Sequence, residues 1–275
     1  MPEGPEIRRA ADRLAAAIVG DPLQRVTFAF PRLKHFERVL RGHRIRAITP
    51  RGKALLTAFD NGWTLYTHNQ LYGVWKVADA GRWPDTTRSL RVALETARSA
   101  ILLYSATDIE LWRSDEIGNH PFLQGLGPDV LDPSLTNTQV VQRLQSPTFR
   151  NRALGGLLLD QGFLAGLGNY LRAEILYAVG LHPALRPCDL DAGQTRQLAK
   201  ALLAVPRLSY QTRGVEPKPG LREDYQAHEG EAFRFHVFQR EGEPCERCGT
   251  PIARITSNSR PLFLCPHCQR SLRED

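Results

Sequence analysis

The order of apolar and polar residues predicts that strands dominate the first part of the chain. Apolar side chains spaced three and four positions apart predict a helix over residues 5–19, closed by Gly20. Asp60-Asn61-Gly62 lies between two strand-like stretches and is a strong hairpin signal. The strand-like stretches are short, partly alternating and rich in β-branched or aromatic residues. They are residues 23–30, 44–50, 53–59, 63–68, 91–97 and 100–106. This pattern is typical of an antiparallel β-sandwich or barrel behind an N-terminal helix.

A helical pattern follows a turn-rich linker at residues 126–136. The apolar periodicity predicts helices at 137–147, 150–159, 169–179 and 191–205. Residues 214–230 are polar and rich in glycine and proline, which predicts a mobile loop. Short strands are expected around the cysteines near the C-terminus. The sequence therefore predicts an α+β multidomain protein.

Composition indicates a globular protein of the reduced cytoplasm. Hydrophobic residues make up 42% of the 275 residues, which is enough for real cores. No apolar run approaches the ~20 residues of a membrane span, and no signal peptide is recognisable at the N-terminus. The cysteines number five, and an odd number without a secretion signal favours a cytoplasmic location. We expect no membrane partner and a chain that is self-sufficient as a monomer.

The positive charge of the chain is concentrated in its first part. The formal net charge is +7, and residues 1–55 contain twelve Lys or Arg residues against five acidic ones. A basic region of this kind favours a polyanionic partner, most simply nucleic acid, although a solvated basic surface is the alternative. Lysine is rare here, so Lys53, at a strand entrance after Arg51-Gly52, is notable. A surface lysine is the default interpretation, and a proton donor or phosphate contact is the functional one.

Four cysteines form the strongest motif. CERC at 245–248 and CPHC at 265–268 are separated by sixteen residues, a spacing typical of a four-thiolate zinc site. Because protein fills all four positions, the metal would be structural and would have no open position for catalysis. His267 lies inside the second pair but has poorer spacing than Cys268. We therefore predict one structural Zn²⁺, with Cys245, Cys248, Cys265 and Cys268 as its ligands.

Two stretches in the second half are candidates for phosphate binding. In LLLDQGFLAGLGNYLRAEIL, a helix ends near Asp160 and a new one starts at Asn169, and both are good capping residue types. A helix N-terminus beside glycines suits a phosphate, whereas the plain interpretation is a helical hairpin. Arg260 is expected at the tip of the hairpin between the cysteine pairs. There it can grip a phosphate or enter a groove, although such an arginine is more often a solvated turn residue.

HNQLYGVW at residues 68–75 follows a predicted strand and places Gln70, Leu71 and Tyr72 at a loop or strand end. An amide, an aliphatic and an aromatic side chain in a row can fill the space left by an extruded base. Core packing is the commoner interpretation for Leu71 and Tyr72.

The opening MPEGPEI contains two Pro-Glu pairs. Pro5 and Glu6 fit a helix start, because proline is favoured at the first helical position and acids face the positive end of the helix dipole. Pro2 and Glu3 precede the helix, so the same explanation covers them less well.

These motifs together resemble the formamidopyrimidine-DNA glycosylase/endonuclease VIII family. The stretches that carry the resemblance are MPEGPEIRRA, RGKALL, HNQLYGVW, LLLDQGFLAGLGNYLRAEIL and CERCG…SRPLFLCPHCQ, within residues 2–270. The resemblance implies a catalytic β-sandwich domain with a flanking helix at 2–125. It also implies a helix–two-turn–helix DNA-binding domain with the mobile loop at 126–230, and a zinc-finger hairpin at 231–275.

The resemblance further implies a bifunctional DNA glycosylase and abasic-site lyase of base-excision repair, acting on double-stranded DNA and associated with the nucleoid. Pro2 would be the nucleophile once Met1 is removed, and Glu3 the acid that helps to open the sugar ring. Lys53 would be a proton donor or phosphate contact in the elimination. Asn169 and Arg260 would grip phosphates around the extruded nucleotide, and Arg260 would aid elimination. The void-filling residues would be Gln70, Leu71 and Tyr72.

Within the family, the sequence favours the endonuclease VIII branch and therefore oxidised pyrimidines. The opening reads MPEGPEI, and Met1 is the only methionine, whereas the sister branch inserts a methionine-containing set into DNA. The alternatives are the same chemistry on oxidised purines and, much less favoured, a non-catalytic DNA-binding protein. Two positions depart from the family pattern or match no motif. Gly125 stands where a basic DNA contact is common, and Cys188 is most simply a packing residue.

Overall fold

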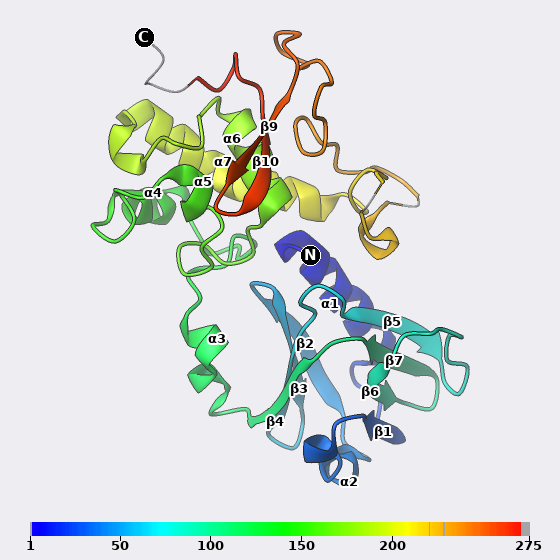
Figure 1. Ribbon diagram of the computed structural model, residues 1–275. Helices are drawn as coiled ribbons and strands as arrows, with labels where there is room; N and C mark the ends of the chain where they lie inside the picture. The colour runs from blue at the N-terminus through cyan, green and yellow to red at the C-terminus, as the bar shows by residue number, and fades with distance from the viewer. Residues whose placement is uncertain (1, 220, 228, 271–275) are drawn as a thin grey trace. The chain divides into compact units, whose positions relative to one another are not determined.

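The computed structural model of the protein describes residues 2–219, 221–227 and 229–270 (Figure 1). Met1 and residues 271–275, the end of the predicted zinc-finger domain, lie outside the described residues. The chain forms two compact units. The first contains Pro2 and Glu6–Gly125, and the second contains Glu3–Pro5 and the chain from Leu126 onward. We call them the sandwich unit and the helical unit and describe each by itself.

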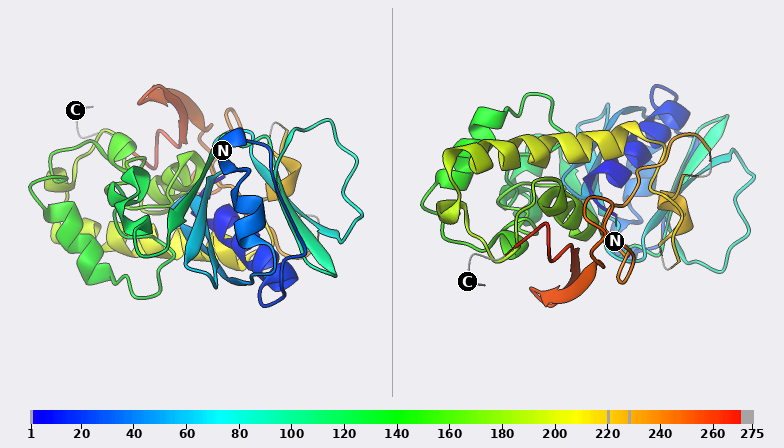
Figure 2. Two further views of the ribbon diagram at one scale, coloured as in Figure 1. Left: turned by 90° about the horizontal axis from the view of Figure 1, so that it is seen from below. Right: turned by 90° about the horizontal axis from the view of Figure 1, so that it is seen from above.

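The sandwich unit contains two four-stranded antiparallel sheets, which appear as separate layers in Figure 2. The first has the order β1 (Arg25–Phe28), β6 (Leu90–Glu95), β7 (Ser99–Tyr104), β5 (Val74–Asp79). The second has the order β2 (Ile45–Arg51), β3 (Ala54–Phe59), β4 (Trp63–His68), β8 (Asp108–Arg113). The helices of this part are α1 (Gly4–Ile18), α2 (Phe36–Leu40) and α3 (Pro121–Gln124), with short 3-10 turns η1 (Pro31–Leu33) and η2 (Ile117–Asn119).

One core joins α1 to both sheets. Leu14 of α1, Phe28 and Ile101 of the first sheet and Leu65 of the second are all fully buried in the same cluster. Burial of such side chains is the main favourable term in folding. The predicted antiparallel sandwich with a flanking helix is therefore confirmed.

Tight turns set the strand register. The predicted hairpin at Asp60-Asn61-Gly62 connects β3 to β4, and Gly62 has a φ of 80°. Gly52-Lys53 forms the two-residue loop between β2 and β3, where Arg51 pairs with Ala54. The φ of Gly52 is 58°, as expected for the glycine that opens a type II′ turn. Lys53 is thus placed by a hairpin turn at the start of β3.

The sequence patterns missed β5, β8, α2 and α3. β5 begins inside the HNQLYGVW motif, where a single glycine is the only turn signal between it and the loop that precedes it. In β8, charges at both ends obscure an alternation in which Ile109 faces the core and Glu110 is only partly buried. Neighbouring strands stabilise both segments, and a single-segment pattern contains no information about such pairing.

Within its described residues, the helical unit contains four α-helices and a hairpin near the C-terminus. The helices are α4 (Asn137–Gln145), α5 (Leu154–Leu157), α6 (Asn169–Ala178) and α7 (Ala192–Gln211), with 3-10 turns η3 (Pro187–Asp189) and η4 (Glu223–Tyr225). The hairpin consists of β9 (Ala253–Ser257) and β10 (Arg260–Leu264). The long α7 contacts α4 and α6. It is the long yellow helix in the right-hand view of Figure 2. These elements confirm the predicted helical domain and finger hairpin.

Two helix boundaries differ from the prediction. The helix expected at 150–159 is only the single turn of α5, because residues 150–153 form a turn before it. The helix expected to end at 205 continues through Pro206 to Gln211. Pro206 and Ser209 are both buried, so apolar packing extends past the proline that would otherwise end the helix. Within the described part of the chain, no helix is long and apolar enough to cross a membrane.

Candidate functional site

Glu3 caps the N-terminus of α6. The residue before the helix, Gly168, makes no side-chain cap bond. Instead, Glu3 Oε1 accepts from the Tyr170 N–H at 2.9 Å and Glu3 Oε2 accepts from the Leu171 N–H at 3.2 Å. These donors and the positive end of the helix dipole stabilise a negatively charged carboxylate. Asn169, expected from its residue type to be the cap, is the first helical residue.

The glycine turns before α6 make room for the N-terminal segment. A Cβ on Gly168 would lie 2.3 Å from the carboxylate carbon of Glu3. The Gly4 N–H donates to the Gly166 carbonyl at 2.7 Å, and Gly166 has a φ of 97°. The N–H groups of Tyr170 and Leu171 are therefore used by Glu3 and are not a phosphate site. The phosphate-binding prediction at this helix start remains only for the Asn169 side chain.

Asn169 is held between α6 and the finger hairpin. Its Oδ1 accepts from Arg172 Nη2 at 2.7 Å, and its Nδ2 donates to the Pro261 carbonyl at 2.9 Å. Arg260 is the neighbour of Pro261 and the first residue of β10, and it is exposed. Among the described residues, Arg260 makes no ion pair. The structure thus brings the two predicted phosphate contacts to one place.

A two-residue turn, directly before Arg260, sets where that arginine leaves the main chain. Asn258 and Ser259 both have positive φ, 54° and 58°, which is the conformation of a type I′ hairpin turn. The turn packs against α5, where a Cβ on Gly156 would lie 2.8 Å from Asn258 Nδ2. The paired glycines of α5 therefore allow the hairpin tip to lie directly on the helical layer.

Arg172 is a part of this site that the sequence analysis did not identify. It lies on α6 with 0% of its surface exposed. Burial and the positive charge of Arg260 lower the pKa of Arg172 to about 10, and the carboxylate of Glu3 partly offsets this. Arg172 therefore remains a cation at neutral pH. The signal in the sequence was an arginine one turn after Asn169 in an otherwise apolar helix face.

The four cysteines fit one tetrahedral metal ion. Their Sγ atoms all lie within 4.8 Å of one another, and Cys248–Cys265 and Cys245–Cys268 are 3.5 and 3.9 Å apart. A tetrahedron with Zn–S bonds of about 2.3 Å requires S–S separations of about 3.8 Å. The Arg247 N–H points to Cys245 Sγ at 3.4 Å, as expected for a metal-binding turn. The predicted structural zinc site is confirmed.

In the sandwich unit, Lys53 is buried at 7% exposure, so the surface-lysine interpretation is wrong. His68 is paired with Ala54, the residue after Lys53, in the β3–β4 register. Burial lowers the pKa of His68, and the charge of Lys53 lowers it further, against an opposing effect of Asp108. His68 Nδ1 accepts from the Gln70 N–H at 3.0 Å. A neutral His68 therefore carries its proton on Nε2.

The loop after β4 presents its side chains to solvent. Leu71 is 48% exposed and Tyr72 is 68% exposed, so core packing is wrong for both. The base of the loop is fixed, because the Gly73 N–H donates to the Asn69 carbonyl at 2.7 Å. Gln70, with a φ of 49°, accepts from Thr107 Oγ1 at 2.8 Å. The result is a rigid base that carries an exposed aliphatic and aromatic tip.

The predicted site residues fall into two groups. Pro2, Lys53 and the loop of Gln70, Leu71 and Tyr72 belong to the sandwich unit. Glu3, Asn169, Arg260 and the cysteines belong to the helical unit. The peptide bond from Pro2 to Glu3 joins the two groups. Cys188 is exposed, so its interpretation as a packing residue is wrong.

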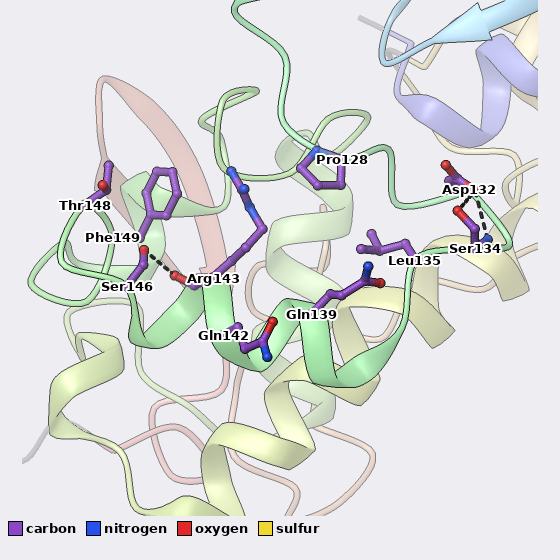
Figure 3. A pocket seen from close by; sticks show the side chains of 10 residues that line it. All are labelled: Pro128, Asp132, Ser134, Leu135, Gln139, Gln142, Arg143, Ser146, Thr148 and Phe149. Atoms are coloured by element: carbon purple, nitrogen blue, oxygen red, sulfur yellow. Dashed lines mark hydrogen bonds between the residues drawn. The ribbon is translucent and has the colours of Figure 1, made fainter.

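A separate hollow of about 550 Å³ lies beside α4 and contains none of these residues (Figure 3). Arg143 from α4 borders it, but its guanidinium donates to the Phe163 and Gly162 carbonyls at 2.9 and 2.7 Å. The same guanidinium lies over the Phe149 ring. Arg143 therefore holds the turn after α5 in place.

Comparison with known families assigns the class of protein. The formamidopyrimidine-DNA glycosylase N-terminal domain matches residues 1–107, and the H2TH domain of the same enzymes matches residues 126–215. The zinc finger found in FPG and IleRS matches residues 242–270. The chain belongs to the formamidopyrimidine-DNA glycosylase/endonuclease VIII family.

Among individual proteins, the chain is similar to Endonuclease 8 of Escherichia coli O17:K52:H18, with 59% identity over 269 residues. Endonuclease 8 of Salmonella schwarzengrund is 58% identical over 270 residues. Each match covers 98% of this chain and 100% of the relative.

Solved structures confirm the fold. A complex of Lactococcus lactis Fpg with DNA containing an abasic site matches with a TM-score of 0.83 at 21% identity. MutM in complex with DNA containing carbocyclic 8-oxo-G matches with a TM-score of 0.82 at 22% identity. Both matches cover 98% of this chain and 100% of the other.

Gly168→Ala should break the cap of α6. The new Cβ would occupy the position of the Glu3 carboxylate, and loss of a helix cap lowers the free energy of unfolding by about 1 to 2 kcal/mol. Chemical denaturation measures the change. Gly118→Ala is the matched control, because a Cβ there meets nothing within 4 Å. A Gly168→Ala protein as stable as the control would contradict the capping contact.

Removing the metal should unfold the finger. We expect one zinc ion per chain in the purified protein, and we expect its loss from Cys265→Ser, because metal binding supplies the folding energy of such a small module. Metal analysis, with hydrogen exchange of β9 and β10, measures both effects. Cys188→Ser is the control and should retain zinc, since Cys188 lies outside the cluster. Zinc retained at full stoichiometry in Cys265→Ser would contradict the assignment.

Proposed function

We propose that this protein is a bifunctional DNA glycosylase and abasic-site lyase of base-excision repair that removes oxidised pyrimidines. The observation that carries the proposal is the Glu3 carboxylate, fixed on two N–H groups of α6 and covalently next to Pro2. The full-length similarity to Endonuclease 8 supports the same reaction class. The substrate is double-stranded DNA, so the protein works in the cytoplasm at the nucleoid, and it works as a monomer.

Pro2 is the nucleophile after Met1 is removed. An α-amino group has a pKa of about 8, against about 10.4 for lysine, so much more of it is neutral at pH 7. The neutral nitrogen bonds to C1′ of the damaged nucleotide, and the bond from C1′ to the base breaks. This is covalent catalysis by an amine.

Glu3 moves the proton that this step releases. Attack leaves a proton on the proline nitrogen, and the adjacent residue carries the Glu3 carboxylate, which accepts from the Tyr170 and Leu171 N–H groups. Glu3 accepts that proton and passes it to O4′ as the sugar ring opens. The nitrogen is then a cationic iminium, because proline has no second N–H to lose.

The iminium accepts the electron pair that is released when C2′ loses a proton, and this makes strand cleavage possible. Loss of a proton from C2′ expels the 3′ phosphate by β-elimination, and a second proton loss expels the 5′ phosphate by δ-elimination. Buried Lys53 donates a proton or contacts a phosphate during these steps. Asn169 and Arg260, adjacent at the finger hairpin, grip the phosphates that flank the extruded nucleotide.

The loop tip fills the gap in the duplex. Leu71 and Tyr72 are exposed apolar side chains on a fixed base, and Gln70 stands beside them. Apolar side chains of this kind insert between base steps when a nucleotide is extruded.

Oxidised purines are the second candidate substrate. The solved structures similar to this chain include one with 8-oxo-G DNA, but at 22% identity it shows the fold alone. The NQLYG loop without methionine and the similarity to Endonuclease 8 favour pyrimidines. A pure DNA-binding protein would need neither a buried Lys53 nor a Glu3 fixed beside the N-terminal amine.

Borohydride should trap Pro2 on DNA. Reduction of the iminium formed with an abasic-site duplex should give a covalent adduct, and digestion with mass spectrometry should place it on the peptide that begins with Pro2. Lys53→Met should still form the adduct, because Lys53 acts after the nitrogen has attacked. Protein that retains Met1 should not form it on Pro2, whose nitrogen is then an amide. An adduct on Lys53 would overturn the nucleophile assignment.

The assignment to the endonuclease VIII branch predicts which of two lesions is excised faster. Thymine glycol should be excised more than about tenfold faster than 8-oxoguanine opposite cytosine, because contacts in a binding pocket commonly discriminate between substrates by this factor or more. Single-turnover kinetics on matched duplexes measure both rates, with cleavage of an abasic site as the common reference. The reverse order would assign the protein to the purine branch while leaving the Pro2 chemistry intact.

A further inference from the structure

Arg172 connects the parts of the helical unit that carry the proposed phosphate contacts. Its Nη1 donates to the Gly155 carbonyl of α5 at 2.8 Å. Its Nη2 donates to Asn169 Oδ1 at 2.7 Å. Longer contacts of 3.4 Å reach the carbonyls of Ser257 and Pro261, one on each strand of the finger hairpin. One planar guanidinium therefore touches α5, α6, β9 and β10.

The contact to Asn169 fixes which way its amide points. A guanidinium only donates hydrogen bonds, so the atom of Asn169 that faces Arg172 must be the oxygen. The amide nitrogen must then face the other way, where it donates one hydrogen to the Pro261 carbonyl. An amide nitrogen has two hydrogens, so a second donor remains for an anion beside Arg260.

The contacts to the hairpin fix the position of Arg260. Ser257 and Pro261 flank the strained two-residue turn, and Arg260 directly precedes Pro261. Arg172 reaches the main chain on both sides of that turn, so it fixes the origin of the Arg260 side chain. It also places a second positive charge behind Arg260, close enough for the two guanidinium groups to repel each other. An anion relieves this repulsion, and a DNA phosphate is such an anion.

We propose that Arg172 is a positioning residue for phosphate recognition, which orients the Asn169 amide, fixes the Arg260 turn and adds a buried positive charge behind both. The inference rests on the proposed roles of Asn169 and Arg260. A purely stabilising role explains the geometry less well, because a buried cation whose hydrogen-bond partners are all neutral is costly where an apolar side chain of similar volume would pack.

The test uses the full-length zinc-loaded protein and a duplex that contains a tetrahydrofuran abasic-site analogue, which the lyase does not cleave. Arg172→Met should raise the Kd by about tenfold, because hydrogen bonds to charged groups are lost and a partner amide is released. In the Asn169→Ala background, the same change should raise the Kd by less than about threefold, because residues that act through one another are not additive. Melting temperature and zinc content confirm that each protein is folded.

Two further variants separate positioning from charge and from general stability. Arg172→Lys retains the cation but cannot reach Asn169 and the hairpin carbonyls together, so its Kd should rise by at least about threefold. It also serves as the second variant if Arg172→Met folds poorly. Arg207→Met is the matched control, because Arg207 also donates to two main-chain carbonyls, of Asp132 and Leu135, at 3.1 Å. This control should bind the duplex as the wild type does.

The outcomes distinguish the inference from the function on which it rests. If Asn169→Ala and Arg260→Ala bind the duplex as tightly as the wild type, the proposed phosphate contacts are wrong, and the inference is wrong with them. If those variants bind weakly but Arg172→Met or Arg172→Lys binds normally, only the inference is overturned. Equal losses for Arg172→Met with and without Asn169 would also overturn it.

Discussion

The bond between the Glu3 carboxylate and the first N–H groups of α6 is the constraint around which the candidate site residues of the helical unit are arranged. It ties a residue from the extreme N-terminus to a helix in the second half of the chain. Because Pro2 is the preceding residue, the same bond limits where the N-terminal amine can lie. The glycine at 168 follows from this constraint, since any side chain there would occupy the space of the carboxylate.

Helix α6 is held by charged groups from distant parts of the sequence. A carboxylate caps its start, and at its other end Arg247 donates to the Tyr177 and Ala178 carbonyls at 2.8 and 3.1 Å. Both charges have the sign that the helix dipole favours. On its interior side, Glu174 accepts from three successive N–H groups, those of residues 236–238, at 2.9 to 3.1 Å. A helix of ten residues thus organises the N-terminus, the finger and the segment between them.

The sequence predicted what depends on short-range patterns. The sandwich strands, the hairpin at Gly62 and the four zinc ligands could be predicted because alternation, turn chemistry and ligand spacing are local signals. The partners of Glu3 and the role of Arg172 could not be predicted, because both depend on contacts between residues far apart in the chain. The same limit applies to β8, which is stable through its pairing with β4. The exposure of Leu71 and Tyr72 could not be predicted from their residue types either, because large apolar side chains are usually buried in a core.

The zinc site and α6 together hold the finger hairpin in place. The finger has only a small apolar cluster, shared with Ala173 and Tyr177 of α6, so its own core is too small to hold a hairpin firmly. The metal closes one end of the hairpin, and the contacts of its turn with α5 and Arg172 fix the other end. Tyr177 connects the two ends, because its hydroxyl lies 3.4 Å from Cys245 Sγ while α6 begins at Asn169. A structural metal with no reactive position therefore bears on the proposed function, because it holds the hairpin that carries Arg260, the proposed phosphate contact.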